Sequence, residues 1–171
     1  MDNTALLVID AQNEMFAEDN PVYNKDGLLE NLKNLIEGAR SANVPVIFVQ
    51  HNDRALVAGN HDWQIHASVQ PLAGEAVIQK TTPDSFHQTE LQNALKAKNI
   101  QNLILAGNQT EYCIDTTCRR AYSLGYKVTL AKDGHGTWDS ELLTAKQIID
   151  HHNDVLSSFA ELKEAKEIQF S

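Results

Sequence analysis

Short apolar runs alternate with amphipathic stretches along most of the chain. The runs are apolar throughout, without the in-and-out alternation of a half-exposed strand, so they favour strands buried on both faces. The predicted strands are Thr4–Asp10, Val44–Gln50, Ala76–Gln79, Asn102–Ala106 and Lys127–Ala131, with Lys166–Phe170 as a candidate edge strand.

Between these runs, apolar residues recur at the spacing of a helix face. The predicted helices are Gly27–Ala42, Asp84–Lys98, Glu111–Leu124 and a last long helix capped by Asp139 or Ser140. Strands that alternate with helices indicate parallel βαβ units with right-handed crossovers. The pattern therefore predicts a three-layer α/β/α sandwich around a mostly parallel, Rossmann-like sheet of about six strands.

The 171 residues suit one domain, and we expect residues 1–171 to form it. Two stretches without a clear period, Ala11–Asp26 and His51–Gly74, are long for loops in a compact domain. Loops of this length are often functional, so these two are where we expect substrate specificity to lie.

The net charge of the chain excludes some classes of binding partner. A net charge of −9 argues against nucleic acid and against an anionic membrane surface. No apolar run approaches the ~20 residues that span a bilayer, and the first residues lack the basic start of a signal peptide. We expect a cytoplasmic protein that acts on a small molecule.

The two cysteines, Cys113 and Cys118, lie on one predicted helix with Cα atoms ~8 Å apart, too far for a disulfide. Cys113 falls in the first turn, where free N–H groups and the helix dipole favour a thiolate and a lowered pKa. The same N–H groups could hold an oxyanion. The alternative is that Cys113, like Cys118, is a small packing residue.

Three reactive side chains lie at or just past the ends of predicted strands: Asp10, Lys80 and Cys113. In open α/β folds, ligands sit beyond the carboxyl ends of the strands. The fold would therefore bring these residues from distant parts of the sequence to one edge of the sheet. This convergence favours the catalytic interpretation of Cys113 over the packing one.

The chain resembles a known family over nearly its whole length. Four segments carry the resemblance: LVIDAQ at 7–12, Lys80-Thr81 with Ser85-Phe86, GNQTEYC at 107–113 and GYKV at 125–128. In this order and spacing they are similar to the isochorismatase-like cysteine hydrolase superfamily, which includes nicotinamidases and N-carbamoylsarcosine amidohydrolases.

The resemblance implies a catalytic triad of Asp10, Lys80 and Cys113. It also implies a cis peptide bond between Asn108 and Gln109, and an oxyanion hole formed by the backbone N–H groups of Gln109 and Cys113. The implied reaction is hydrolysis of an amide or ureide C–N bond through a thioester, without a cofactor. The resemblance further implies a homodimer or homotetramer.

The chain departs from its relatives after the second predicted strand. Nicotinamidases have a metal motif there, an Asp followed two residues on by a His and later by another His. In this chain His51 precedes Asp53, and the later histidines are His61 and His66. We therefore expect no metal. Arg54 is the candidate for binding a substrate carboxylate, as in N-carbamoyl amidohydrolases.

Isochorismatases proper lack the cysteine, so Cys113 argues against their vinyl-ether hydrolysis. Two alternatives stay open: an isochorismatase-type hydrolase of a non-amide small molecule, and a non-catalytic α/β binding module with an ordinary Cys113. A Rossmann-type dinucleotide site is disfavoured because no G-x-G-x-x-G follows the first strand.

Substrate contacts are predicted from position alone. Gln12 lies two residues past Asp10, Tyr112 lies beside Cys113, and Phe16 and Trp63 could provide aromatic walls. His135, which follows the fifth predicted strand, is interpreted as a loop histidine.

Overall fold

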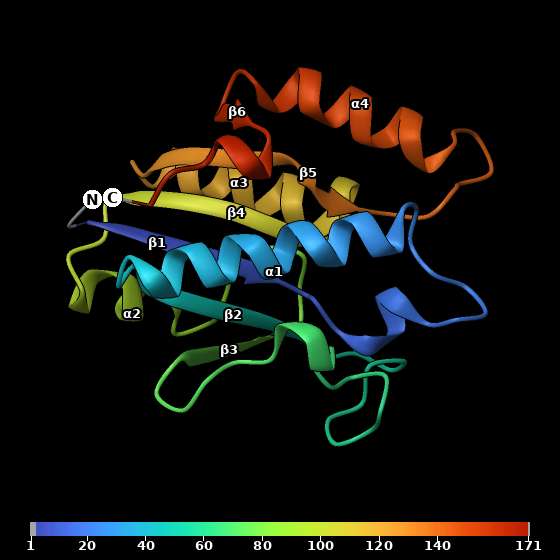
Figure 1. The fold of residues 1–171 in the computed structure, drawn as a ribbon, viewed down its shortest axis with the longest axis horizontal. Coiled ribbons are helices and arrows are strands. Elements are labelled where there is room, and N and C mark those ends of the chain that lie inside the picture. The colour runs from blue at the N-terminus through green and yellow to red at the C-terminus, as the bar shows by residue number, and fades with distance from the viewer. Residues whose placement is uncertain (1–2, 171) are drawn as a thin grey trace.

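The computed structural model of the chain describes residues 3–170. Its centre is one six-stranded sheet in the order β3-β2-β1-β4-β5-β6, in which every neighbouring pair is parallel (Figure 1). The strands are β1 Thr4–Ile9, β2 Val46–His51, β3 Ala76–Lys80, β4 Asn102–Asn108, β5 Lys127–Gly136 and β6 Glu161–Lys163. The predicted parallel sheet is confirmed.

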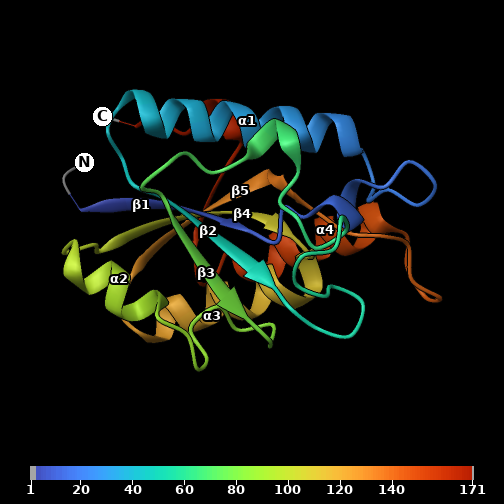
Figure 2. The same ribbon diagram turned by 90° about the horizontal axis from the view of Figure 1, so that it is seen from below.

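Helices cover both faces of this sheet. Figure 2 shows α1 on one side of the strands and α2 and α3 on the other, which completes the predicted α/β/α sandwich. The helices are α1 Lys25–Ser41, α2 Leu91–Ala97, α3 Asp115–Ser123 and α4 Ala145–Leu156. None of the helices within residues 3–170 is both long and apolar enough to cross a bilayer.

The alternation of side chains along β1 explains the unbroken apolar run in the sequence. Leu6 and Val8 belong to the core beneath α1, whereas Leu7 and Ile9 belong to the core on the side of α2 and α3. A strand buried on both faces needs apolar residues at successive positions. Burial of this central strand positions the residues that follow it.

The sheet also has a topological switch point. The chain runs from β1 outward to β2 and β3, then returns to place β4 on the other side of β1. Ligands in open α/β sheets bind beyond the carboxyl ends of the strands at such a point. Asp10 follows β1 there, and residues 109–114 follow β4.

The fifth strand is longer than predicted. The predicted strand ended at Ala131 and His135 was interpreted as a loop histidine, but His135 lies within β5, because the pairing of β4 with β5 resumes after a register shift. Gly107 pairs with His135, and Asn108 with Gly136. The glycines and polar residues that suggested a loop accommodate this bulge.

The predicted helix Asp84–Lys98 is wrong in its first half, since α2 begins only at Leu91. Side chains bond to the backbone before that point: Asp84 Oδ1 accepts from the Phe86 N–H, and the Thr89 hydroxyl donates to the Ser85 carbonyl. Such local bonds compete with helical hydrogen bonds.

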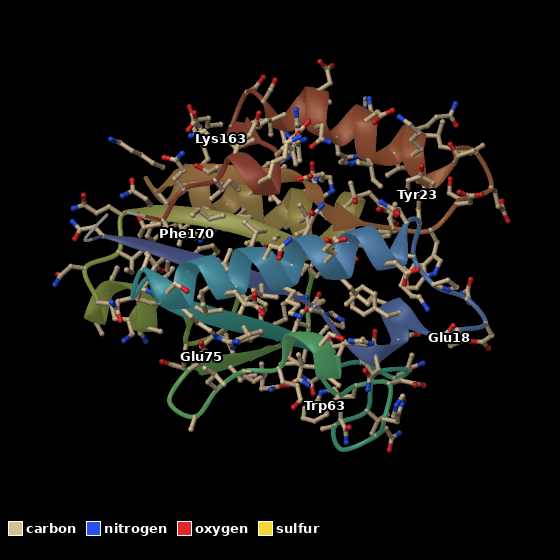
Figure 3. The ribbon with its side chains drawn as sticks, in the orientation of Figure 1. Glu18, Tyr23, Trp63, Glu75, Lys163 and Phe170 are labelled. Carbon is tan, nitrogen blue, oxygen red and sulfur yellow. The ribbon has the colours of Figure 1, made fainter. Side chains whose placement is uncertain are left out.

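Two predictions near the C-terminus also need correction. The cap of α4 is Thr144, which forms a capping box with Gln147, although Asp139 still accepts a bond from the Ala145 N–H. The edge strand β6 is Glu161–Lys163, not Lys166–Phe170. Phe170 instead packs against the core beneath α1, as Figure 3 shows.

Candidate active site

The side chains of Asp10, Lys80 and Cys113 meet at the carboxyl edge of the sheet. Lys80 Nζ lies 2.7 Å from Asp10 Oδ2 and 3.1 Å from Cys113 Sγ. Both charged side chains are almost fully buried, with 0% and 2% exposure for Lys80 and Asp10. A buried charge is tolerated when it is paired and hydrogen-bonded, as here.

The segments that carry these residues are held tightly. Asp10 adopts a left-handed conformation (φ 47°), which an aspartate tolerates better than most residues, and its N–H donates to the Val49 carbonyl. Gly107 (φ 126°) has no room for a Cβ, which would overlap the Ile9 carbonyl oxygen. The ends of β1 and β4 therefore run in close contact.

Cys113 lies in a π-helical turn, Thr110–Ile114, and not in the first turn of the α-helix as predicted. The α-helix α3 begins only at Asp115. The turn is anchored at its start, where the Thr110 hydroxyl lies 2.9 Å from His135 Nδ1. The peptide bond between Asn108 and Gln109, which leads into the turn, is cis.

The environment of Cys113 also reverses the predicted direction of its pKa. Burial, and then the negative charge of Asp10, raise the pKa of the thiol to about 12, and Lys80 only partly offsets them. Burial likewise raises the pKa of Asp10 above its ordinary 3.8, against the opposing effect of Lys80. The thiol is therefore protonated at neutral pH, and its ionisation needs a base beside it.

A cavity of about 380 Å³ opens onto Cys113. Its walls are apolar and aromatic, and its charged lining groups are carboxylates. The lining residues are Asp10, Glu14, Met15, His51, Asp53, Ala55, Leu56, Pro83, Gln109, Tyr112, Cys113 and Trp138. We call this cavity the Cys113 pocket. No lysine or arginine lines it within the part of the chain that the structure describes.

A slightly larger hollow of about 450 Å³ lies at the opposite end of the sheet, against the starts of β4, β5 and β6. Its lining includes Asn102, Lys127 and Glu161 but no cysteine or histidine. The Cys113 pocket is therefore the better candidate for an active site, because it joins a cavity to a nucleophile and titratable groups.

Only one of the four predicted substrate contacts lines the Cys113 pocket, and that is Tyr112. Gln12 is fully buried and bonds to the backbone, with Nε2 donating to the carbonyls of His51 and Trp63. Phe16 lies in the core beneath α1.

Trp63, labelled in Figure 3, donates from Nε1 to Asn52 Oδ1 and lines a separate hollow. Arg54, the candidate for a substrate carboxylate, is exposed and does not line the pocket. The structure thus places Gln12, Phe16, Trp63 and Arg54 outside the cavity, so it gives no support for direct substrate contacts by them.

The pocket contains side chains that the sequence did not single out for it, chiefly Glu14, Trp138 and His51. Glu14 comes from a single short 3-10 turn, Asn13–Phe16, and Trp138 from an irregular segment, and neither offers a period from which a side-chain direction could be predicted. His51, however, is the last residue of β2, so the strand-end argument that found Asp10 would have found it too.

Donor atoms of Asp10, His51 and Cys113 lie within 4.8 Å of one another, close enough for metal ligands. However, Lys80 Nζ is within hydrogen-bond distance of all three side chains. The centre of the cluster therefore already holds a cation, and this donor set does not fit a metal ion. His61, by contrast, is an exposed side chain on the loop after β2.

Comparison with known proteins identifies the family of this chain. The family model of the isochorismatase domain matches residues 4–165. The chain belongs to the isochorismatase family. It is 34% identical over 140 residues to the uncharacterized isochorismatase family protein YddQ of Bacillus subtilis, covering 78% of each chain.

It is also 30% identical to nicotinamidase 3 of Arabidopsis thaliana, over 81% of this chain and 75% of the relative. Among solved structures, a putative isochorismatase hydrolase from Oleispira antarctica superposes with a TM-score of 0.91 at 32% identity, covering 97% of this chain and 95% of the other. The family includes amidohydrolases, so these likenesses support a hydrolase.

Proposed function

We propose that this protein is a cysteine hydrolase that cleaves the C–N bond of a small amide or ureide, with Asp10, Lys80 and Cys113 as its catalytic residues. The observation that carries the proposal is the position of Lys80 Nζ, 2.7 Å from Asp10 Oδ2 and 3.1 Å from the Cys113 sulfur that lines the pocket. A nucleophile and a base thus line one cavity, and a buried lysine lies in contact with both behind its wall.

The names of several relatives support the proposal that a C–N bond is cleaved. Besides nicotinamidase 3, they include streptothricin hydrolase of Streptomyces noursei, 34% identical over 79% of this chain and 50% of the relative. The ureidoacrylate amidohydrolase RutB of Agrobacterium fabrum is 25% identical over 76% of this chain and 74% of the relative. A nicotinamidase and an amidohydrolase both act on C–N bonds.

The first step follows from the protonation states. The Cys113 thiol has a pKa of about 12, so it enters the reaction with its proton. The Asp10 carboxylate takes this proton as Sγ attacks the carbonyl carbon and a C–S bond forms. Lys80 pairs with the Asp10 carboxylate and also lies 3.1 Å from the sulfur, so it can stabilise the negative charge that develops during the attack.

The oxyanion that forms on the substrate needs donors aimed at it. The proposed donors are the backbone N–H groups of Gln109 and Cys113, two residues that line the pocket. Within residues 3–170, the Gln109 N–H has no hydrogen-bond partner. An unpartnered N–H on a residue that lines the pocket supports this assignment.

The intermediate then collapses. Protonated Asp10 returns its proton to the leaving nitrogen as the C–N bond breaks, and ammonia or an amine departs. The remaining acyl group is a thioester on Cys113. Water attacks it with Asp10 again acting as base, which releases the carboxylic or carbamic acid and restores the thiol. The sum is one amide bond and one water consumed per acid and amine formed.

The charge of the pocket speaks against an anionic substrate, both for an amide and for the non-amide small molecule of the isochorismatase-type alternative. The charged groups that line it, Asp10, Glu14 and Asp53, are all acidic. Lys80 lies behind them and is already paired with Asp10. An anionic substrate would meet repulsion there without a compensating cation.

The test is release of ammonia or amine from a panel of small amides and ureides by the wild-type protein and by Cys113→Ala. We expect release by the wild type, and release by the variant at the level of the uncatalysed control. Equal release by both proteins would remove Cys113 from the mechanism. If no compound reacts while both proteins bind the same compounds equally, the protein is a binding module.

A further inference from the structure

His51 lies closer to the proposed catalytic lysine than the sequence suggested. It is the last residue of β2 and pairs in register with Lys80, the last residue of β3. Its Nδ1 atom lies 2.8 Å from Lys80 Nζ. Building on the proposed function, we propose that His51 is a positioning residue, whose neutral ring accepts the third N–H of Lys80 and holds the ammonium between Asp10 and Cys113.

The argument begins with the donors of Lys80. A lysine ammonium has three N–H groups and accepts no hydrogen bond. Three acceptors surround it in the structure: Asp10 Oδ2 at 2.7 Å, His51 Nδ1 at 2.8 Å and Cys113 Sγ at 3.1 Å. Without His51 one buried N–H would lack a partner, and the flexible side chain could turn away from the sulfur.

The contact with Lys80 also fixes the tautomer of His51. Because Nδ1 must accept a hydrogen bond, the ring proton lies on Nε2. Nε2 is 3.4 Å from Asp53 Oδ2. Asp53 is itself anchored, since its other oxygen accepts from the N–H groups of Ala55 and Leu56, each at 2.8 Å. The ring is thus held from both sides.

The main chain of His51 is fixed as well, and this gives Gln12 a role. Gln12 Oε1 accepts from the His51 N–H at 2.9 Å, and Gln12 Nε2 donates to the His51 carbonyl at 3.0 Å. This reciprocal pair fixes the end of β2 against the segment that follows β1. Gln12 therefore supports the site from behind instead of touching the substrate.

The surroundings keep the ring neutral. The charged and titratable groups facing it are Lys80 from β3, Asp10 from β1, Cys113 from the π-helical turn and Asp53 from its own loop. Burial, followed by the charge of Lys80, lowers the pKa of His51 below its ordinary 6.5, although Asp10 and Asp53 oppose the shift. A protonated ring would lose the acceptor that Lys80 requires.

The experiment compares two substitutions. In His51→Asn, the side-chain oxygen can take the place of Nδ1 and keep the acceptor. In His51→Leu, the acceptor is lost at similar volume. His61→Leu, an exposed histidine outside the pocket, is the control. The readout is the rate of iodoacetamide labelling of Cys113 in the intact protein, followed by mass spectrometry across pH, and it needs no substrate.

We expect His51→Leu to slow labelling of Cys113 at pH 8 by about tenfold or more, because a displaced Lys80 no longer stabilises the negative charge that develops on the sulfur during attack. His51→Asn should stay within roughly threefold of wild type, and His61→Leu should match it. On an active amide, His51→Leu should lower kcat with little change in KM. Labelling of His51→Leu at the wild-type rate would overturn the inference.

A second measurement is independent of whether His51→Leu folds. Nitrogen-15 NMR of the wild-type imidazole should show the Nε2–H tautomer at neutral pH, and a proton on Nδ1 would overturn the inference. The outcomes also separate the two proposals. Slowed labelling without turnover of any amide retains the positioning role and removes the hydrolase. Normal turnover with unchanged labelling does the reverse.

Discussion

The two cysteines lie five residues apart in the sequence and are almost equally buried. Cys113 is 8% exposed and Cys118 is fully buried. Burial is the first cause that raises the pKa of each thiol, in both cases to about 12. Neither burial nor the ease of losing a proton therefore distinguishes a nucleophile from a packing residue in this protein.

Their neighbours do distinguish them. Cys113 lines a cavity and touches the buried pair of Lys80 and Asp10. Cys118 lies in the core under α3, and the ion pair near it, Asp115 with Arg119, lies along the outside of the helix. Chemical competence thus follows from access and from a base that can take the proton during attack, rather than from a thiolate present beforehand.

The largest expected effect comes from exchanging the acidic neighbour of each cysteine. Asp10→Asn removes the proposed base, so kcat/KM for an amide should fall about 10²–10⁴-fold. Asp115→Asn makes the same chemical change beside Cys118 and should leave kcat/KM within about threefold of wild type. Steady-state kinetics of amine release measure both. Comparable losses in the two variants would mean that Asp10 acts only through stability.

The next effect concerns His135, which anchors the turn that carries Cys113. It is buried, with Nδ1 near the Thr110 hydroxyl and Nε2 near Asn153 Oδ1, and burial lowers its pKa to about 4. The unfolded chain binds the proton at the ordinary value of 6.5, before the folded chain does. Stability is therefore fully present above pH 6.5 and falls as the pH drops towards 4, by roughly 3 kcal/mol.

Urea unfolding at a series of pH values measures this slope. His135→Gln, which has no titrating ring, should reduce the slope between pH 6.5 and 4, whereas His151→Gln on the exposed side of α4 should not. A wild-type stability that stays flat over this range would contradict a neutral buried His135.

The third effect is the fall in the reactivity of Cys113 at low pH, which gives its pH–rate profile an acid limb. Burial raises the pKa of Asp10 above 3.8, so the carboxylate that accepts the thiol proton is lost at a higher pH than for an ordinary aspartate. Labelling of Cys113 should therefore fall about tenfold per pH unit below a midpoint that lies above 3.8. Mass-spectrometric labelling across pH measures the limb, and Asp10→Asn should lack it.

Cys118 serves as the internal control for that experiment. Being fully buried, it should be labelled only when the chain unfolds. An acid limb that coincides with the appearance of labelled Cys118 would report unfolding through His135. A limb seen while Cys118 stays unlabelled belongs to Asp10.

The sequence predicted the residues that are placed by regular structure. Strand ends in a parallel sheet share one edge, so the sequence pattern predicted that Asp10, Lys80 and Cys113 lie close together. In the structure, Lys80 contacts both Asp10 and Cys113. His51 was not assigned to the site, although it directly follows the predicted strand Val44–Gln50 just as Lys80 follows Ala76–Gln79. The strand-end argument applies equally to both residues, but His51 was considered only for a metal motif.

The sequence pattern could not predict two other kinds of feature: the directions of some side chains and the local environment of Cys113. The direction of a side chain in a loop or a single 3-10 turn depends on contacts with distant residues, which is why Gln12 and Phe16 were placed at the pocket but lie behind it. The π-helical turn and its raised thiol pKa follow from burial against β4, β5 and α4, which no local spacing encodes.

A smaller effect is expected on the preference between cationic and anionic substrates. Glu14 lines the Cys113 pocket, and burial together with the charges of Asp53 and Asp62 raises its pKa. No cation pairs with it among the described residues. Amides bearing an ammonium group should therefore be preferred over amides bearing a carboxylate, and Glu14→Gln should narrow that preference by about three- to tenfold, mainly through KM. Matched amides that differ only in this group, compared by kcat/KM, measure the change. An unchanged preference would place the substrate's charge elsewhere in the pocket, with Asp53 as the next carboxylate to substitute, while Cys113 and its buried ion pair would keep the role argued above.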